Sequence, residues 1–191
     1  MENRYNVLMD DLPEEWNGCG LNTDFRNGIR IIQVMGDEEF STMERLEYAT
    51  ELLFEELPAS REDYLQGLLW YLSGWNQDGK VKEDKDDVIV MDYDIDQWRI
   101  YSAFLKQYRI DLSRAEMHFW VFMGLLTNLD ECSFTRVVNV RTMKLDSKMP
   151  QKQREALKKA KQMYRIDQNG QEDDKVSQAR EEFLRYAGLN K

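Results

Sequence analysis

The chain has 191 residues and is 12% aromatic, so it is long enough to bury a core and too apolar for global disorder. Its net charge of −10 is uneven: residues 1–100 carry 24 acidic and 9 basic side chains, and residues 101–191 carry 12 and 17. The acidic half argues against a nucleic-acid partner, because phosphates are bound by cations. No apolar run approaches the roughly 20 residues that span a bilayer, the start lacks a secretory signal, and the two cysteines stand far apart, so we expect a soluble cytoplasmic protein with free thiols.

The first elements are punctuated by breakers and caps. Proline and glycine interrupt the first 22 residues and predict a turn or small hairpin. A helix then begins at Thr23 or Asp24, is weakened by Gly28 and ends near Gly36. A capping box at 41–44 starts a second helix that runs to Pro58, and "SRED" at 60–63 starts a third that runs to about residue 75. The polar segment 76–87 predicts a loop, and 88–91 is a short β-favouring run.

Three aspartates at alternate positions, Asp92, Asp94 and Asp96, resemble the start of a calcium loop. The glycine at position 6 and the glutamate at position 12 of such a loop are both absent, so we expect no metal. Asp94 and Gln97 have the spacing of a capping box instead. We therefore expect a fourth helix, with one apolar stripe formed by Trp98, Tyr101, Leu105 and Tyr108.

The remaining chain is also helical in pattern. A capping box at Ser113 and Glu116 introduces a helix that is apolar nearly all round, which is typical of a central buried helix. Further helices are expected over 131–143, 150–164 and 172–187. The fold class is therefore mainly α: a compact bundle of about eight helices after a short N-terminal non-helical or hairpin segment, with one domain over 1–166 and a helical appendage over 167–191.

Candidate chemistry is sparse. The only histidine, His118, lies in the most apolar helix without a suitably placed partner, so we expect a structural role and no enzyme. Signatures of phosphate loops, dinucleotide sites, hydrolases and transition-metal sites are missing, and no cofactor is expected. The lysine-rich helix at 150–164 has an apolar stripe and suits packing better than nucleic-acid binding.

Several longer motifs resemble a bacteriophage family named after gene product fifteen. They are "LPEEW", "LNTDFRNGIRI", "LLFEELP", "LLWYL", "YDIDQWRIYSAFLKQYRIDL", "MHFWVFMGLLTNL" and "VVNVRTMKL", and they cover nearly the whole chain. The resemblance implies a protein of the phage tail genes, without catalytic residues. It further implies a tail assembly chaperone in the host cytoplasm that binds the tape-measure protein and is absent from the finished particle.

Such a chaperone would hold amphipathic client segments in an apolar groove. Candidates for exposed apolar contacts are Leu52, Leu53, Trp70 and Trp75, and the alternative for each is an ordinary core position. Self-association is a further possibility. Two alternative functions stay open: a structural subunit of the tail or head–tail region, and a regulatory or immune-modulating phage protein that binds a host factor.

Overall fold

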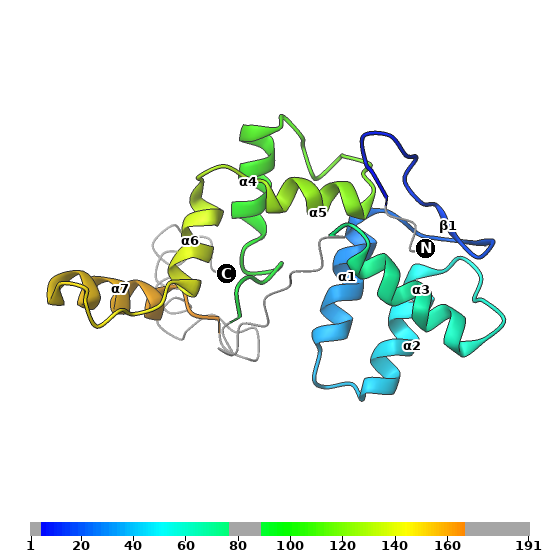
Figure 1. Cartoon of the computed structure of the whole chain (residues 1–191), viewed down its shortest axis with the longest axis horizontal. Coiled ribbons are helices and arrows are strands. Elements are labelled where there is room, and N and C mark those ends of the chain that lie inside the picture. Colours follow the sequence, from blue (N-terminus) through cyan, green and yellow to red (C-terminus); the bar gives the residue numbers. More distant parts are fainter. Residues whose placement is uncertain (1–4, 77–88, 167–191) are drawn as a thin grey trace, which may run out of the picture. The chain divides into compact units, whose positions relative to one another are not determined.

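The computed structural model describes residues 5–76 and 89–166, and Figure 1 locates their elements. Contacts divide the chain into two units, each built from two stretches of sequence. Unit 1 comprises Met1–Lys82 and Ser113–Asn128, and unit 2 comprises Glu83–Leu112 and Leu129–Lys191. The described residues contain seven helices and one two-stranded sheet, which confirms a mainly α protein with an N-terminal hairpin. The predicted eighth helix, the appendage over 167–191 and nearly all of the predicted 76–87 loop lie outside the described residues.

Unit 1 begins with the hairpin. Strands β1 (Glu15–Trp16) and β2 (Cys19–Gly20) pair antiparallel. The two residues between them, Asn17 and Gly18, both have positive φ, as a two-residue hairpin turn of right-handed twist requires. Beyond β2, the extended backbone continues and pairs with the end of the second helix, where the Asn22 amide donates to the Leu53 carbonyl at 2.7 Å. The hairpin is thereby tied to the end of the second helix.

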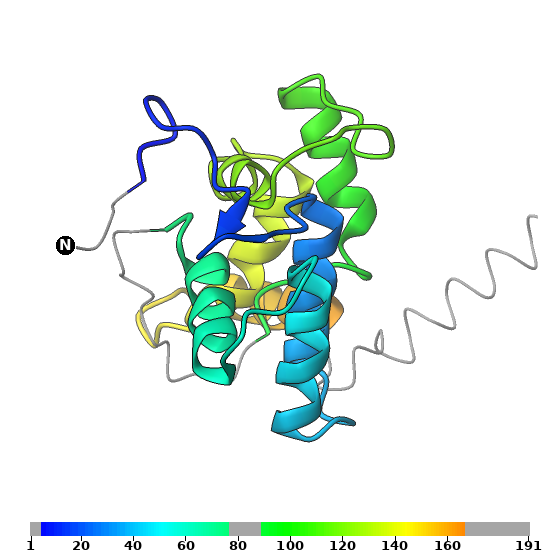
Figure 2. The ribbon, with the colours of Figure 1, turned by 90° about the vertical axis from the view of Figure 1, so that its right-hand side faces the viewer.

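Four helices complete unit 1: α1 (Phe25–Gly36), α2 (Thr42–Leu53), α3 (Arg61–Ser73) and α5 (Phe119–Thr127). Helices α1 and α2 run alongside each other: they are side by side in Figure 1, and α2 lies in front of α1 in Figure 2. The predicted caps at Asp24, Ser41 and Ser60 are confirmed, and Ser41 and Glu44 form the complete capping box. Helix α2 ends at Leu53, earlier than predicted, because the next residues pair with the extended backbone that continues from β2.

Helix α5 begins at Phe119, so the predicted start at Ser113 is wrong. Residues 117–119 instead pair with residues 23–25, at the start of α1. The Phe25 amide donates to the Met117 carbonyl at 2.9 Å, and the Phe119 amide donates to the Thr23 carbonyl at 2.8 Å. This short antiparallel pairing joins the N-terminal ends of two helices that are far apart in the sequence.

The glycine at position 28 has a packing role that its low helix propensity conceals. A Cβ placed on Gly28 would lie 2.1 Å from a ring carbon of Phe119. Gly28 therefore lets α1 and α5 approach closely. A glycine in the middle of a helix lowers its stability, and here that loss is the condition for the close contact with Phe119. Gly36, at the end of the same helix, has nothing within 4 Å of such a Cβ.

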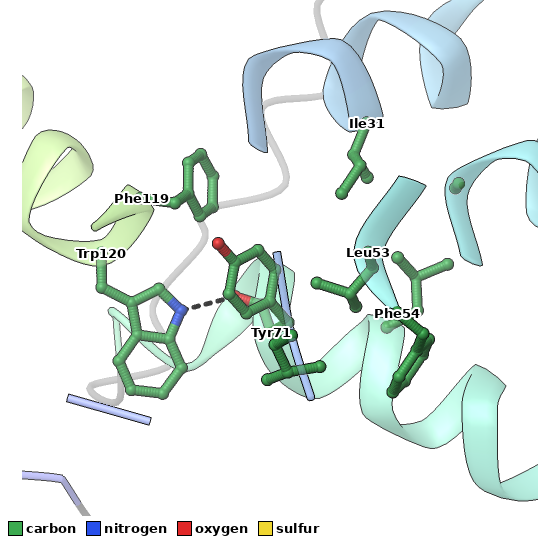
Figure 3. Close-up of a cluster of buried hydrophobic side chains, with 9 residues drawn as sticks. Ile31, Leu53, Phe54, Tyr71, Phe119 and Trp120 are labelled. Atoms are coloured by element: carbon green, nitrogen blue, oxygen red, sulfur yellow. Dashed lines mark hydrogen bonds between the residues drawn. The ribbon is translucent and has the colours of Figure 1, made fainter. Parts of the chain in front are cut away.

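The core of unit 1 is apolar and aromatic (Figure 3). Tyr71 and Phe119 are wholly buried, and their rings stack with centroids 5.4 Å apart. The indole N–H of Trp120 donates to the Tyr71 carbonyl at 2.7 Å, shown as the dashed line. The central, buried position predicted for the apolar helix is confirmed, since four of its nine residues are buried.

Unit 2 contains α4 (Gln97–Gln107), α6 (Ser133–Thr142) and α7 (Gln151–Met163), of which α4 and α7 each contact α6. The predicted apolar stripe is not the buried face of α4, because Trp98 is 72% and Leu105 42% exposed. The buried residues of α4 are Ile100, Ala103 and Phe104. No strand includes residues 89–91, the described part of the predicted β-favouring run.

Asp94 and Gln97 do not form the predicted capping box at the start of α4. Asp96 occupies the cap position of α4, but its carboxylate makes no cap bond and is 0% exposed. It binds the Arg141 guanidinium through two contacts, at 2.5 and 3.2 Å, and the Arg99 guanidinium at 2.8 Å. Arg141 also donates to the Tyr164 carbonyl at 2.6 Å. The prediction of Asp94 as the cap is wrong because Asp96 starts the helix and pairs across the unit.

Candidate functional site

The four residues predicted to contact a partner occupy different environments. Leu53 is wholly buried in the core, so the expectation that it is exposed is wrong. Leu52 and Trp70 are partly buried and pack against that core, and the Trp70 ring contacts those of Trp16 and Trp120. Trp75 is also partly buried, but it lines a cavity. Trp75 is therefore the member of the set that lies at a hollow of unit 1.

That cavity has a volume of about 330 Å³ and lies wholly within unit 1. Three parts of the unit form it: the N-terminal segment, the two residues that follow α3, and α5 with its C-cap residue. We call it the aromatic pocket, and its lining residues are Tyr5, Val7, Leu12, Gly74, Trp75, Trp120, Val121, Gly124, Leu125 and Asn128.

The indole N–H groups of both tryptophans in the aromatic pocket already donate to backbone carbonyls. The Trp75 indole donates to the Leu72 carbonyl at 3.1 Å, and the Trp120 indole donates to the Tyr71 carbonyl. The Tyr5 ring meets that of Trp120 edge to face, with centroids 5.3 Å apart. The walls therefore offer mainly apolar surface, which suits an apolar side chain better than a polar ligand.

Beside the aromatic pocket, a compact loop presents three exposed apolar side chains. Val7, Leu8 and Met9 are 65%, 90% and 83% exposed, and we call them the apolar tip. The loop is ordered by Asn6, whose amide donates to the Asp10 carboxylate at 2.8 Å and whose carbonyl accepts from Met9 and Asp10. Val7 belongs to both features. Adjacent exposed apolar residues on an ordered loop indicate an interaction surface.

The surroundings of the aromatic pocket are negatively charged. Asp10 and Asp11 are exposed and stand between the lining residues Val7 and Leu12. Burial of the Tyr5 phenol, and then the charges of these two aspartates, raise the pKa of Tyr5. Unit 1 as a whole has 18 acidic and 8 basic side chains, which accounts for the full net charge of −10, whereas unit 2 has 18 of each.

His118 is a helix cap. Its Nδ1 accepts from the Trp120 amide at 3.0 Å, and its Nε2 lies 3.1 Å from the Pro13 carbonyl. These contacts fit a neutral ring with the proton on Nε2, and burial lowers the pKa of His118. Within residues 5–76 and 89–166, no group of three or more potential metal-ligating side chains occurs and no helix is long and apolar enough to cross a membrane.

Sequence reasoning missed the apolar tip, Trp120 and Gly124 as parts of a site. Trp120 and Gly124 are indistinguishable from core residues on a helix that is apolar all round. The apolar tip did leave a signal: "VLM" is an apolar run without helical or strand periodicity, between Asn6 and "DD". Apolar residues in such a non-periodic segment have no helix or strand face on which to be buried.

The comparisons with known proteins give a family. Neither the search of curated proteins nor the search of solved structures finds a significant match. The family model described as bacteriophage Gp15 protein matches residues 8–166. This span includes most of both units and the larger part of the aromatic pocket. The chain therefore belongs to the bacteriophage Gp15 protein family.

Proposed function

We propose that this chain is a tail assembly chaperone-like protein, which binds the tape-measure protein in the host cytoplasm during tail morphogenesis and acts without catalysis. Membership of the phage family supports a role in the phage, and the resemblance to tail-gene proteins supports this particular one. The observation that carries the proposal is the aromatic pocket beside the apolar tip. A client that self-associates through apolar segments is protected when those segments are held in such a surface.

Of the four residues predicted to contact a partner, only some have surface available for binding. Trp75 remains a candidate contact because it lines the aromatic pocket. The wholly buried Leu53 offers a client no surface, and Leu52 and Trp70 are partly buried against the core and do not line the pocket. The apolar tip takes their place, since Leu8 and Met9 have most of their surface available.

Co-expression with the tape-measure protein of the same phage tests the proposal. We expect the tape-measure protein to be insoluble alone and to elute with this chain as a complex in size-exclusion chromatography with mass determination. A client that stays insoluble while this chain elutes alone would contradict the proposal. Finding the chain in purified virions would favour a structural subunit of the tail instead.

A variant of the apolar tip makes the test specific. Leu8→Ser with Met9→Ser should abolish or strongly reduce the complex, while the fold is retained because both side chains are largely exposed. Leu69→Ser is the matched control, since Leu69 is 61% exposed on α3 and does not line the aromatic pocket. Equal loss of the complex in both variants would argue against a localised surface.

A further inference from the structure

The aromatic pocket also indicates what its partner looks like. We propose that it receives one large apolar side chain from an amphipathic segment of the client, and that Lys or Arg residues flank this side chain in the client sequence. This inference rests on the proposed function and specifies the chemistry of the partner.

The volume and the apolar walls of the pocket indicate which side chain of the client it receives. About 330 Å³ lies at the lower end of the roughly 300–1,000 Å³ that ligand pockets span, so the pocket has room for one large side chain rather than for a large ligand. The tryptophan indoles in its wall donate to backbone carbonyls, which leaves ring surface for contact. A buried aromatic or aliphatic anchor is the usual centre of a protein interface.

The negative charge around the pocket indicates which residues flank the anchor side chain in the client sequence. Asp10 and Asp11 lie between two lining residues and are close enough to Tyr5 to raise its pKa. The wider unit carries ten more acidic than basic side chains, so the field over the pocket attracts cations and repels acidic segments. Complementary charge at the rim of an interface speeds association and selects the partner.

Gly124 provides a way to fill the pocket from within. It lines the cavity on α5, and a Cβ placed on it meets nothing within 4 Å. Gly124→Leu therefore extends a side chain from an open position and replaces a helical glycine with a better helix former. Gly36→Leu is the matched control, because Gly36 is also helical, has the same open surroundings, and does not line the pocket.

The experiment measures binding of overlapping synthetic peptides that cover the tape-measure protein, with tryptophan fluorescence and calorimetry as readouts. We expect the tightest peptides to carry an aromatic or large aliphatic residue flanked by Lys or Arg. Gly124→Leu should weaken them about tenfold or more, and Gly36→Leu should leave them unchanged. Gly124→Ala serves as a milder second variant if the leucine disturbs folding, which circular dichroism will reveal.

The charge requirement is tested separately. Asp11→Lys should weaken binding several-fold and reduce its salt dependence. Glu38→Lys makes the same charge change in the exposed turn between α1 and α2, away from the lining residues, and should have a smaller effect. Preference for peptides without cations, or equal effects of the two lysine variants, would overturn the charge requirement.

Failure of the inference is distinguishable from failure of the proposed function. If the wild type binds neither the client nor its peptides, the proposed function fails and the inference falls with it. If the wild type binds them and Gly124→Leu binds equally well, only the pocket assignment is overturned. A wild-type dimer that becomes monomeric on Gly124→Leu would make a second copy the occupant and would likewise overturn the assignment.

Discussion

In unit 1, the interior is closed by aromatic rings, and the buried polar residues of its described part, Asn27 and Thr50, are neutral. Asn27, for example, donates to the Leu52 carbonyl at 2.6 Å, and the Thr50 hydroxyl donates to the Leu46 carbonyl at 2.9 Å. In unit 2, the buried polar groups are Asp96 and Arg141, a charged pair 3% exposed or less at the side chains. We infer that the loss of a single contact lowers the stability of unit 1 only in small steps. Unit 2 depends more strongly on one interaction, the Asp96–Arg141 pair, because removing either charge alone leaves the other buried without its partner.

The largest expected effect comes from breaking this ion pair. Asp96→Ala leaves the Arg141 guanidinium buried without its charge partner, which should cost about 3–5 kcal/mol of unfolding free energy. Hydrogen exchange followed by mass spectrometry should show lost protection in α4 and α6. Unit 1 should keep its protection, so equal loss in α1 and α2 would contradict the separation of the two interiors.

A double replacement sharpens the same comparison. Asp96→Leu with Arg141→Met removes both charges and should recover most of the lost stability, because an apolar pair often replaces a buried ion pair without net cost. Urea unfolding followed by circular dichroism measures the recovery. A double variant as unstable as Asp96→Ala would show that the backbone contacts of Arg141, to Tyr164 and Val90, carry most of its contribution.

A smaller effect is expected from tightening the apolar interior of unit 1. Gly28→Ala forces a Cβ against the Phe119 ring and should cost about 2 kcal/mol, within the range for overpacked cores. Gly36→Ala, in the same helix but with open surroundings, should instead gain up to about 1 kcal/mol. Urea midpoints of the two variants measure the difference, and shifts in the same direction would contradict the proposed packing role of Gly28.

The smallest expected effect is a pH dependence in unit 1. Burial lowers the pKa of His118 from its ordinary value of 6.5, so the unfolded chain binds a proton in a window below that value where the folded chain does not. The unfolding free energy should therefore fall as the pH decreases through the window, and this contribution should level off below the folded pKa. Urea unfolding between about pH 7.5 and 5.5 measures it.

His118→Asn supplies the control for this pH dependence. Asparagine is a favoured helix cap and cannot titrate, so the variant keeps an acceptor for the Trp120 amide and loses the pH dependence. The sequence contains one histidine, so no second imidazole contributes in this range. A wild-type stability that rises on acidification through the window would contradict the neutral cap.

What could be predicted from the sequence was local. The capping box at Ser41 and the N-cap at Ser60 are confirmed because cap and helix lie within four residues. The expected caps Asp94 and Ser113 failed because distant residues determine those helix starts: Arg141 holds Asp96, and residues 23–25 pair with 117–119. The aromatic pocket could not be predicted for the same reason, since its walls come from three separated segments.

The division of the chain into units has a consequence for the order of events during synthesis. Unit 1 includes residues 113–128, which are synthesised after residues 83–112 of unit 2. The core of unit 1 therefore cannot be completed until residues 113–128 have left the ribosome. Until then, the wall of Tyr71 and Leu53 lacks Phe119 and Trp120 and stays open to water or to other nascent chains. A truncation after Lys82 would leave the core of unit 1 without Phe119 and Trp120 permanently. Unit 2 therefore cannot be removed by shortening the gene without also removing α5, the central helix of unit 1.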